Sequence, residues 1–208
     1  MKVLLLNGSS HPNGCTYTAL HEITDVLESA GLETEILFLG NEPVRDCIAC
    51  GTCAKEPGKC VFDDDVVNRI IEKAWEADGF VFGTPVYYAH PSGRILSVLD
   101  RAFYAGKPAF IHKPAAAIAS ARRAGTTATL DVLQKYFTIS QMPVVSSTYW
   151  TMVHGRQPED VKKDEEGLQT MRNLALNMVW MLKCIEAGKA AGIQPPQAET
   201  GARTNFIR

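Results

Sequence analysis

The hydrophobic pattern of this chain alternates between short apolar runs and longer amphipathic segments. In the amphipathic segments the apolar residues recur at helical spacing, as at Ile70, Ile71 and Ala74. The apolar runs are predicted to be strands, at residues 2–7, 33–39, 80–82, 114–119 and 142–146. Buried strands that alternate with helices are typical of βαβ units, which build a parallel sheet with helices on both faces.

The predicted helices lie between these strands. The first begins at Thr16, and the next begins at Asp63, where three consecutive aspartates suit a helix N-terminus. Another runs from Arg94 to about Tyr104, and the one after it is amphipathic around Leu133. A long final helix follows a charged stretch. The pattern therefore predicts an α/β protein with five strands.

The sequence holds no internal repeat and no linker long enough to separate two domains. We expect one domain over residues 1–187, with a cysteine-rich insertion at 41–62 that has no periodicity of its own. Residues 188–208 are predicted to form a C-terminal tail, which either frays or reaches along the surface to a neighbouring subunit.

The final helix is apolar on more than one side. Val179 and Trp180 widen the apolar surface beyond its main stripe, and Cys184 is expected to lie in the core. The main stripe consists of Leu168, Met171, Ala175, Met178, Leu182 and Ile185. A helix of this kind is buried against its own domain and against something else, which predicts a homo-oligomer.

Composition narrows the class of protein further. The 208 residues are 46% hydrophobic, which is enough for a sizeable core. Lysine and arginine total 21 against 23 acidic residues, so neither nucleic acid nor an anionic membrane is expected as a partner. The apolar runs are too short to span a bilayer, and the N-terminus lacks the layout of a signal peptide. We therefore expect a cytoplasmic protein.

The loop after the first strand is the first candidate binding site. It runs from Gly8 to Thr16 with the sequence GSSHPNGCT, and a helix follows it. Hydroxyl groups beside a helix N-terminus suit an anion. The loop lacks the G-x-G-x-x-G spacing of dinucleotide folds and the lysine of a P-loop. A single phosphate monoester fits best, as in FMN bound to a flavodoxin-like sheet of order 2-1-3-4-5.

Two later loops complete this hypothesis. The loop after the third strand carries Tyr87 and Tyr88, whose rings and backbone can line an isoalloxazine ring. The loop after the fourth strand carries Arg122 and Arg123, which are expected to meet flavin, to meet the 2′-phosphate of NADPH, or to stay solvated. His154 follows the fifth strand and is predicted either to face the flavin's pyrimidine edge or to lie free on the surface.

These three loops resemble those of the NADPH-dependent FMN reductase family. The similar segments are NGSSHPNGCT, GTPVYYAHPSGRILSVLDR and ASARRAGTT, and within the family they are most similar to the branch of iron–sulfur flavoproteins and multimeric quinone-reductase flavodoxins. The resemblance implies a flavodoxin-like three-layer sandwich and a dimer or tetramer. This sequence departs from the family's pattern at two positions: His11 stands where the family often has arginine, and Cys15 stands where it often has asparagine.

The resemblance also assigns residues to the flavin. It implies that 9–16 hold the phosphate, that 85–88 contact the ring, and that 120–125 lie along the ring and the ribityl chain. Together with the loop chemistry, the predicted FMN residues are Ser9, His11, Asn13, Gly14, Cys15, Thr16, Pro85, Val86, Tyr87, Tyr88, Ser120, Arg122, Arg123, Gly125 and His154.

A cluster of cysteines is the second candidate site. Cys47, Cys50, Cys53 and Cys60 lie within one short stretch of the insertion. Two consecutive C-x2-C spacings are typical of [4Fe–4S] ligation, zinc would accept the same thiolates, and free thiols are the third alternative. Because the insertion follows the second strand, we expect it near the carboxyl edge of the sheet. Electrons would then pass to flavin, across a subunit boundary.

Three functions remain open. The first is an FMN-dependent oxidoreductase that takes hydride from NAD(P)H and passes electrons to a quinone, a flavin or another small acceptor. The second is an iron–sulfur flavoprotein that exchanges electrons with ferredoxin. The third is a redox sensor that responds through its flavin and thiols. In each case the protein binds and orients the cofactor, so no protein nucleophile or acid–base pair is predicted.

Overall fold

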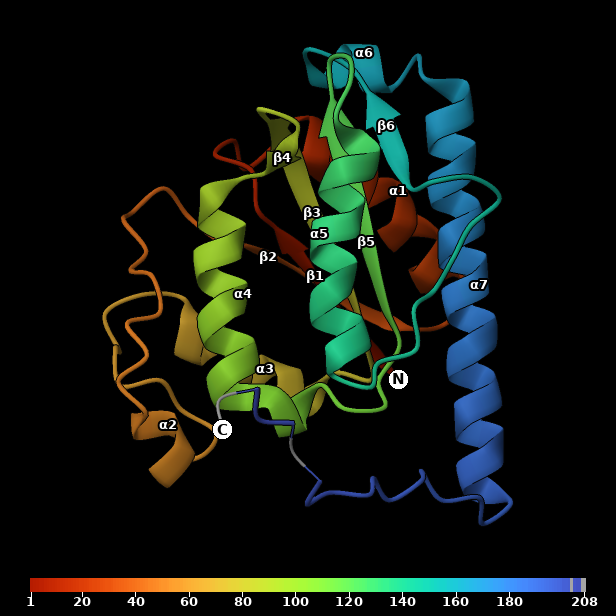
Figure 1. Ribbon diagram of the computed structural model, residues 1–208. Coiled ribbons are helices and arrows are strands. Elements are labelled where there is room, and N and C mark those ends of the chain that lie inside the picture. The colour runs from red at the N-terminus through yellow and green to blue at the C-terminus, as the bar shows by residue number, and fades with distance from the viewer. Residues whose placement is uncertain (203, 207–208) are drawn as a thin grey trace.

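The computed structural model describes residues 1–202 and 204–206. Its sheet has five parallel strands in the order β2-β1-β3-β5-β6 (Figure 1). Their bounds are β1 Lys2–Asn7, β2 Glu33–Phe38, β3 Gly79–Tyr87, β5 Ala115–Ala121 and β6 Met152–His154. The two-residue strand β4, His90–Pro91, pairs antiparallel with the end of β3. Without β4, the order along the chain is 2-1-3-4-5, which confirms the predicted flavodoxin-like fold.

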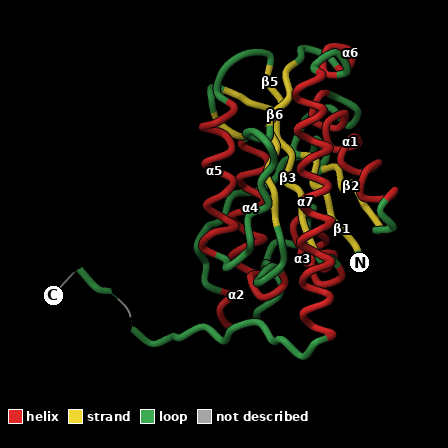
Figure 2. Tube along the Cα trace, turned by 90° about the vertical axis from the view of Figure 1, so that its right-hand side faces the viewer, coloured by secondary structure: helices red, strands yellow, loops and turns green. Residues whose placement is uncertain are grey.

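Helices cover both faces of the sheet. The long ones are α1 Cys15–Ser29, α3 Val67–Glu76, α4 Gly93–Gly106, α5 Thr126–Ile139 and α7 Glu165–Ala190, and the short ones are α2 Thr52–Lys55, η1 Lys107–Ala109 and α6 Pro158–Val161. One layer consists of α3, α4 and α5, and the other of α1 and α7. Figure 2 shows α5 and α1 on opposite sides of the strands.

The two cores follow from the alternation of side chains along each strand. On β1, Leu4 and Leu6 pack toward α3, α4 and α5, whereas Val3 and Leu5 pack toward α1 and α7. All four side chains are fully buried. Continuous apolar strands of this kind are expected where both faces of a parallel sheet are covered.

The fifth strand does not lie where the sequence predicts it. Within the predicted range 142–146 only Val144 forms a bridge, to Ala115, and the regular strand is β6. The edge strand is divided because Thr151 Oγ1 donates to Ala117 O at 2.6 Å, in the place of a backbone donor. The chain between these two pieces leaves the sheet, and Ser147 donates there to Thr170 O.

The second predicted helix also begins later than expected. It starts at Val67 instead of Asp63, because the aspartates accept hydrogen bonds at the helix entrance instead of joining the helix. Asp65 Oδ1 accepts from Val67 N at 3.0 Å, and Asp63 Oδ1 accepts from Asn68 Nδ2 at 3.0 Å. Carboxylates are favoured there because helix N-termini present unpaired N–H groups.

The last helix has an exposed apolar face. Trp180 is 66% exposed and Leu176 is 55% exposed, while Met171, Met178 and Leu182 are buried against the sheet. Cys184 is exposed, so its predicted place in the core is wrong: its helical position turns it away from the buried stripe. Among the described helices, even α7 lacks a segment apolar enough to cross a membrane.

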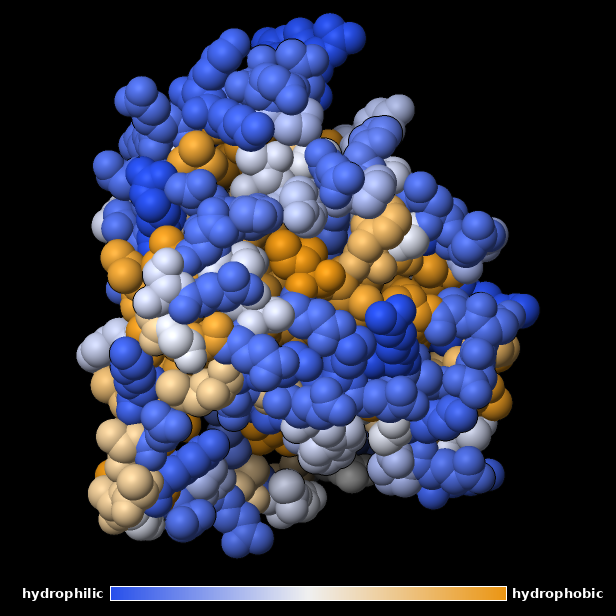
Figure 3. All heavy atoms as spheres, turned by 180° about the vertical axis from the view of Figure 1, so that it is seen from behind, coloured by the Kyte–Doolittle hydropathy of each residue, from blue (hydrophilic) through white to orange (hydrophobic). Residues whose placement is uncertain are grey.

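The remaining surface is mostly polar. From behind, hydrophilic residues cover most of the molecule, and hydrophobic atoms show in patches across its middle (Figure 3). Beyond α7 the described tail has no helix or strand and extends away from the body (Figure 2). Of the predicted tail, residues 203, 207 and 208 lie outside the described part of the chain.

Candidate functional site

The loop between β1 and α1 is shaped by two buried polar side chains. Asn7 Oδ1 accepts from Ser9 N at 3.1 Å, and Asn7 Nδ2 donates to Pro12 O at 3.0 Å. Ser9 Oγ accepts from His11 N at 3.0 Å. These bonds fold the loop over the start of α1, where Gly14 is the N-cap and no side chain caps the helix. The first N–H groups of α1 therefore remain available to an anion.

Buried hydroxyl groups connect this loop to the other two. Thr16 and Ser120 share a hydrogen bond of 2.8 Å between their hydroxyl oxygens, which joins the start of α1 to the end of β5. Ser92 Oγ donates to Gly8 O at 2.9 Å, and Ser92 N donates to Thr84 Oγ1 at 3.0 Å. The three predicted flavin loops thus meet at the carboxyl edge of the sheet.

The loop after β3 is a tight hairpin. Tyr88 and Ala89 have φ angles of 52° and 57°, which is the left-handed conformation that a two-residue turn requires. Tyr87 and His90 pair across the hairpin. The turn pushes Tyr88 fully into solvent, while Tyr87 is 45% exposed. Both rings are therefore open to a flat ligand.

Gly125 is where the loop after β5 meets this hairpin. Its φ is 99°, and a Cβ on it would lie 2.6 Å from Ala89 Cα and 2.9 Å from Val86 Cγ1. Only glycine permits this approach. The structure therefore brings Val86 and Gly125 together, and their predicted contact with the flavin ring stays a prediction.

His154 lies at the end of β6 and closes the site from the other side. Its Nε2 is 3.2 Å from Arg123 O, and its backbone N donates to Asp164 Oδ2 at 2.6 Å. The imidazole is partly exposed and contacts the loop after β5, while its predicted approach to the flavin's pyrimidine edge stays a prediction. Asp164 also caps α7 by accepting from Gly167 N.

The other predicted FMN residues divide by exposure. The side chains of Ser9, Thr16 and Ser120 are buried and support the loops. The exposed residues lie at the rim of the candidate site and are His11, Asn13, Arg122 and Arg123. Pro85 and Val86 are half-buried on β3.

Cys15 lies at the first residue of α1, and its Sγ is 3.7 Å from Gly155 O. Burial raises the pKa of the Cys15 thiol. A thiol whose pKa lies above its ordinary value stays protonated at neutral pH, so Cys15 does not add a negative charge to the phosphate loop.

Sequence reasoning missed the polar residues that hold the loops in place. Asn7, Thr84 and Ser92 are buried at the ends of strands or at the start of α4, and none of them was predicted as a site residue. Ser92 carries an available signal, since a serine before Gly93 is a favoured N-cap. Its second bond, to Gly8 O, depends on contacts between distant segments and has no local signal.

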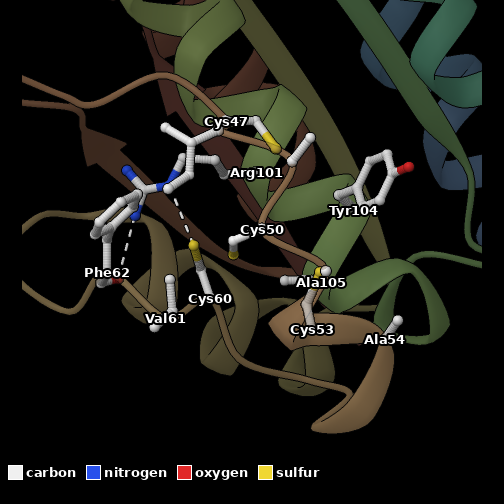
Figure 4. A pocket seen from close by; sticks show the side chains of 13 residues that line it. Cys47, Cys50, Cys53, Ala54, Cys60, Val61, Phe62, Arg101, Tyr104 and Ala105 are labelled. Carbon is white, nitrogen blue, oxygen red and sulfur yellow. Dashed lines mark hydrogen bonds between the residues drawn. The ribbon is translucent and has the colours of Figure 1, made fainter.

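The predicted metal ligands gather around one cavity. Cys47, Cys50, Cys53 and Cys60 all line an apolar cavity of about 190 Å³ between the insertion and α4 (Figure 4). Cys53 and Cys60 are half-buried, Cys47 and Cys50 are exposed, and all are free thiols. Among the described residues, no three histidine, cysteine, aspartate or glutamate side chains are placed to bind one metal ion.

Two buried residues position Cys60. Asn68 Oδ1 accepts from Cys60 N at 2.7 Å, and Asn68 Nδ2 donates to Cys60 O at 3.0 Å. Arg101 Nε donates to Cys60 Sγ at 3.3 Å (Figure 4). Hydrogen bonds from the side chain and backbone of Thr52 lower the pKa of the Cys50 thiol.

The cavity does not lie at the carboxyl edge, where the sequence argument puts it. Gly58 N donates to Ala105 O at 2.8 Å, and Arg101 reaches Cys60, so the later part of the insertion packs on the second half of α4. Because α4 begins beside the flavin loops and rises about 1.5 Å per residue, Ala105 is roughly 18 Å from its first residue. In Figure 1 α2, which belongs to the insertion, lies low, near the lower end of α4 and away from the hairpin.

Comparison with known proteins agrees with this arrangement. Residues 1–157 match the family model for NADPH-dependent FMN reductase. The chain is 33% identical over 198 residues to an iron–sulfur flavoprotein of Methanocaldococcus jannaschii, covering 89% of this chain and 100% of that one. It is 26% identical over 193 residues to an iron–sulfur flavoprotein of Methanosarcina thermophila, covering 91% of this chain and 99% of the relative.

A solved structure, that of a flavone reductase, has the same fold. It superposes with a TM-score of 0.68 at 17% identity, covering 89% of this chain and 64% of the other. The family match spans the β1, β3 and β5 loops that meet at the carboxyl edge of the sheet. The chain belongs to the NADPH-dependent FMN reductase family.

Proposed function

We propose that this chain is an iron–sulfur flavoprotein that transfers electrons between a [4Fe–4S] cluster and FMN. The observation that carries the proposal is the convergence of Cys47, Cys50, Cys53 and Cys60 on one apolar cavity, in a chain that also has the flavin loops. The names of the two relatives above support it, since both are called iron–sulfur flavoproteins.

The flavin loops fit FMN on their own chemistry. The uncapped N-terminus of α1 would hold the phosphate, with Ser9 and Thr16 beside it. Tyr87 would contact the ring, and Gly125 lets the loop after β5 lie close to it. When bound, FMN supplies the one- and two-electron chemistry that no side chain here provides. The side chains bind and orient it.

The cysteine cavity fits a cluster better than a single zinc ion. Four sulfurs around zinc lie about 3.8 Å apart, because each Zn–S bond is about 2.3 Å. A four-iron cluster takes one thiolate at each iron, so its sulfurs are spread more widely. The four cysteines line one apolar cavity, and among the described residues no three metal-ligating side chains meet at a single point.

Two electron partners are compatible with this centre. Ferredoxin suits a carrier that exchanges single electrons through the cysteine cavity. The description of the family favours a second candidate, in which NAD(P)H reduces the flavin and a quinone, a flavin or another small molecule accepts the electrons. Exposed Arg122 and Arg123 at the rim are suited to the phosphates of such a co-substrate.

We also propose that the active form is a homo-oligomer. The exposed apolar face of α7, with Leu176 and Trp180, is the surface that we assign to this association.

Anaerobic purification tests the proposed function. We expect a yellow-brown protein with bound FMN and about four iron atoms per chain. The variant Cys60→Ser should lose most of the iron and keep the flavin, whereas the control Cys184→Ser should keep both. If the protein binds FMN but takes up no iron on reconstitution with ferrous iron and sulfide, the proposed cluster is refuted. The redox-sensor hypothesis, in which the cysteines act as free thiols, would then remain.

The electron donor is tested on the same preparation. Reduction by ferredoxin without reaction with NADPH or NADH would support the carrier. Rapid bleaching of the flavin by NADPH in iron-free protein would support the reductase instead. Protein that binds no FMN would contradict both.

A further inference from the structure

Arg101 is a buried cation in the wall of the cysteine cavity. It belongs to α4, and only 1% of its surface is exposed. Burial of an unpaired guanidinium is costly, so a fully buried arginine needs partners that offset its charge and accept from its N–H groups. Its partners therefore indicate what the residue does.

Three of the four polar contacts are structural. Arg101 Nη1 forms an ion pair with Asp65 and donates to Arg45 O at 3.2 Å. Arg101 Nη2 donates to Phe62 O at 3.1 Å, and the guanidinium lies 5.3 Å from the centre of the Phe62 ring. These contacts tie both ends of the insertion to α4 and fix the plane of the guanidinium.

The fourth contact is of a different kind. With the plane of the guanidinium fixed, its Nε points at Cys60 Sγ at 3.3 Å (Figure 4). A thiol is a weak acceptor, whereas a thiolate bound to iron is a strong one. The arrangement therefore presents a hydrogen bond and a positive charge to one of the four sulfurs.

We propose that Arg101 is a positioning residue that raises the reduction potential of the [4Fe–4S] cluster through Cys60. This inference rests on the proposed function. When the cluster gains one electron, its negative charge increases by one, no bond forms or breaks, and Arg101 keeps its proton. A nearby cation and a hydrogen bond to sulfur stabilise the more negative state, and both are known to set cluster potentials.

Asp65 makes the direction of the effect testable. Its carboxylate neutralises part of the charge of Arg101 and is itself nearly buried, with 6% of its side chain exposed. Removal of Arg101 takes a positive charge from the cavity wall, while removal of the Asp65 charge leaves Arg101 less neutralised. The two changes should therefore shift the potential in opposite directions.

The experiment is a potentiometric titration of the anaerobically purified protein, with the reduced cluster followed by electron paramagnetic resonance. For Arg101→Gln we expect the equilibrium to move about tenfold against reduction, or about 59 mV for a one-electron couple. Asp65→Asn, which keeps an acceptor for Val67 N, should raise the potential. The double variant should lie between the two single variants, and the flavin potential should stay constant.

Arg45→Gln is the matched control. Arg45 belongs to the same insertion and lies 5.1 Å from the centre of the Phe62 ring, but its side chain pairs with Asp64 in solvent and donates to no cysteine among the described residues. Its replacement should leave the cluster potential unchanged. A shift as large as that of Arg101→Gln would show that any nearby charge suffices, and would overturn the assignment to Arg101.

Other results separate this inference from the function on which it rests. Full iron content with an unchanged potential in Arg101→Gln, or shifts of the same sign in both single variants, would overturn the inference alone. If Arg101→Gln lost its iron, Arg101→Lys would retain the charge without the Nε donor. Loss of iron in Arg101→Gln, Arg101→Lys and Asp65→Asn alike would mean that Arg101 is purely structural, and would overturn the inference. Absence of iron in the unaltered protein would overturn both proposals.

Discussion

Single residues at the flavin edge owe their identity to close backbone approaches. Gly125 combines a φ of 99° with a contact so tight that a Cβ would fall 2.6 Å from Ala89 Cα. Gly93 is different, because a Cβ there would meet nothing within 4 Å and its φ is not in the left-handed region. These two glycines therefore form a matched pair for substitution.

We expect Gly125→Ala to lower the free energy of unfolding by about 1–3 kcal/mol, because it adds backbone strain and a clash with the hairpin. The displaced hairpin should also weaken FMN binding at least tenfold, as measured by fluorescence titration of the flavin. Gly93→Ala should leave both quantities nearly unchanged. Equal FMN affinity in Gly125→Ala and the unaltered protein would contradict the role given to this contact.

Asn68 acts at the same scale in the cysteine insertion. It makes reciprocal hydrogen bonds with the backbone of Cys60 and is itself 5% exposed. We expect Asn68→Ala to destabilise the protein by about 2 kcal/mol in urea unfolding, since two buried backbone groups lose their partner.

The control for Asn68 is Asn177→Ala, which removes one exposed bond to Ser146 O and should cost no more than about 0.5 kcal/mol. Asn68→Ala should also make Cys60 react faster with iodoacetamide in iron-free protein. An unchanged rate would show that Asn68 does not hold Cys60 in place.

At the scale of elements, one charged cluster joins β1, β2 and α3. Glu35 on β2 accepts from Lys73 at 2.6 Å and from Lys2 at 3.1 Å. Burial alone raises the pKa of Glu35, but hydrogen bonds from the two lysines outweigh it and hold the pKa below its ordinary value. The cluster closes the amino-terminal edge of the sheet, opposite the flavin loops.

The depressed pKa of Glu35 sets the direction of a pH effect. A carboxylate whose pKa is lower in the folded state stabilises the fold above its unfolded pKa of about 4.3, and this contribution is lost as the pH falls through the folded value. Glu35→Gln should cost about 1 kcal/mol at pH 7 and almost nothing at pH 2. Glu33→Gln, at a side chain that is 71% exposed, should cost less at every pH. A cost for Glu35→Gln that does not change with pH would contradict this account.

At the scale of the whole molecule, the two sides of α7 have different surroundings. One side is buried against α1 and the sheet, and the other exposes Leu176 and Trp180. Ile193, which follows the carboxyl end of α7, is also exposed. Such a face is typical of a contact between subunits.

We expect Trp180→Lys to shift the sedimentation coefficient of the purified protein toward that of a single chain, because it places a charge in the apolar contact. Trp75→Lys, on α3 at 55% exposure, is the control and should leave the assembly intact. If Trp180→Lys sedimented as the unaltered protein does, the contact would have to lie on another face.

The sequence by itself determined the alternation of strands and helices and the positions of the three loops after the strands. Both depend on local signals: apolar runs mark the strands, and the glycines, hydroxyls and aromatics after them mark the loops. The strand order was expected from the fit of these loops to FMN in a flavodoxin-like sheet. In a parallel sheet the ends of consecutive strands meet at one edge, so Thr16 and Ser120 could be expected to lie together before their hydrogen bond was seen.

Only the tertiary structure decided how the edge strand and the cysteine insertion are placed. Val144 and β6 share one edge position because Thr151 pairs with β5 through its hydroxyl, and no local pattern predicts such a pairing. The insertion lies along α4 because Arg101 and Ala105 supply hydrogen-bond partners more than forty residues away in the chain. Contacts between distant segments depend on packing, so the partner of Cys60 cannot be inferred from the spacing of the cysteines.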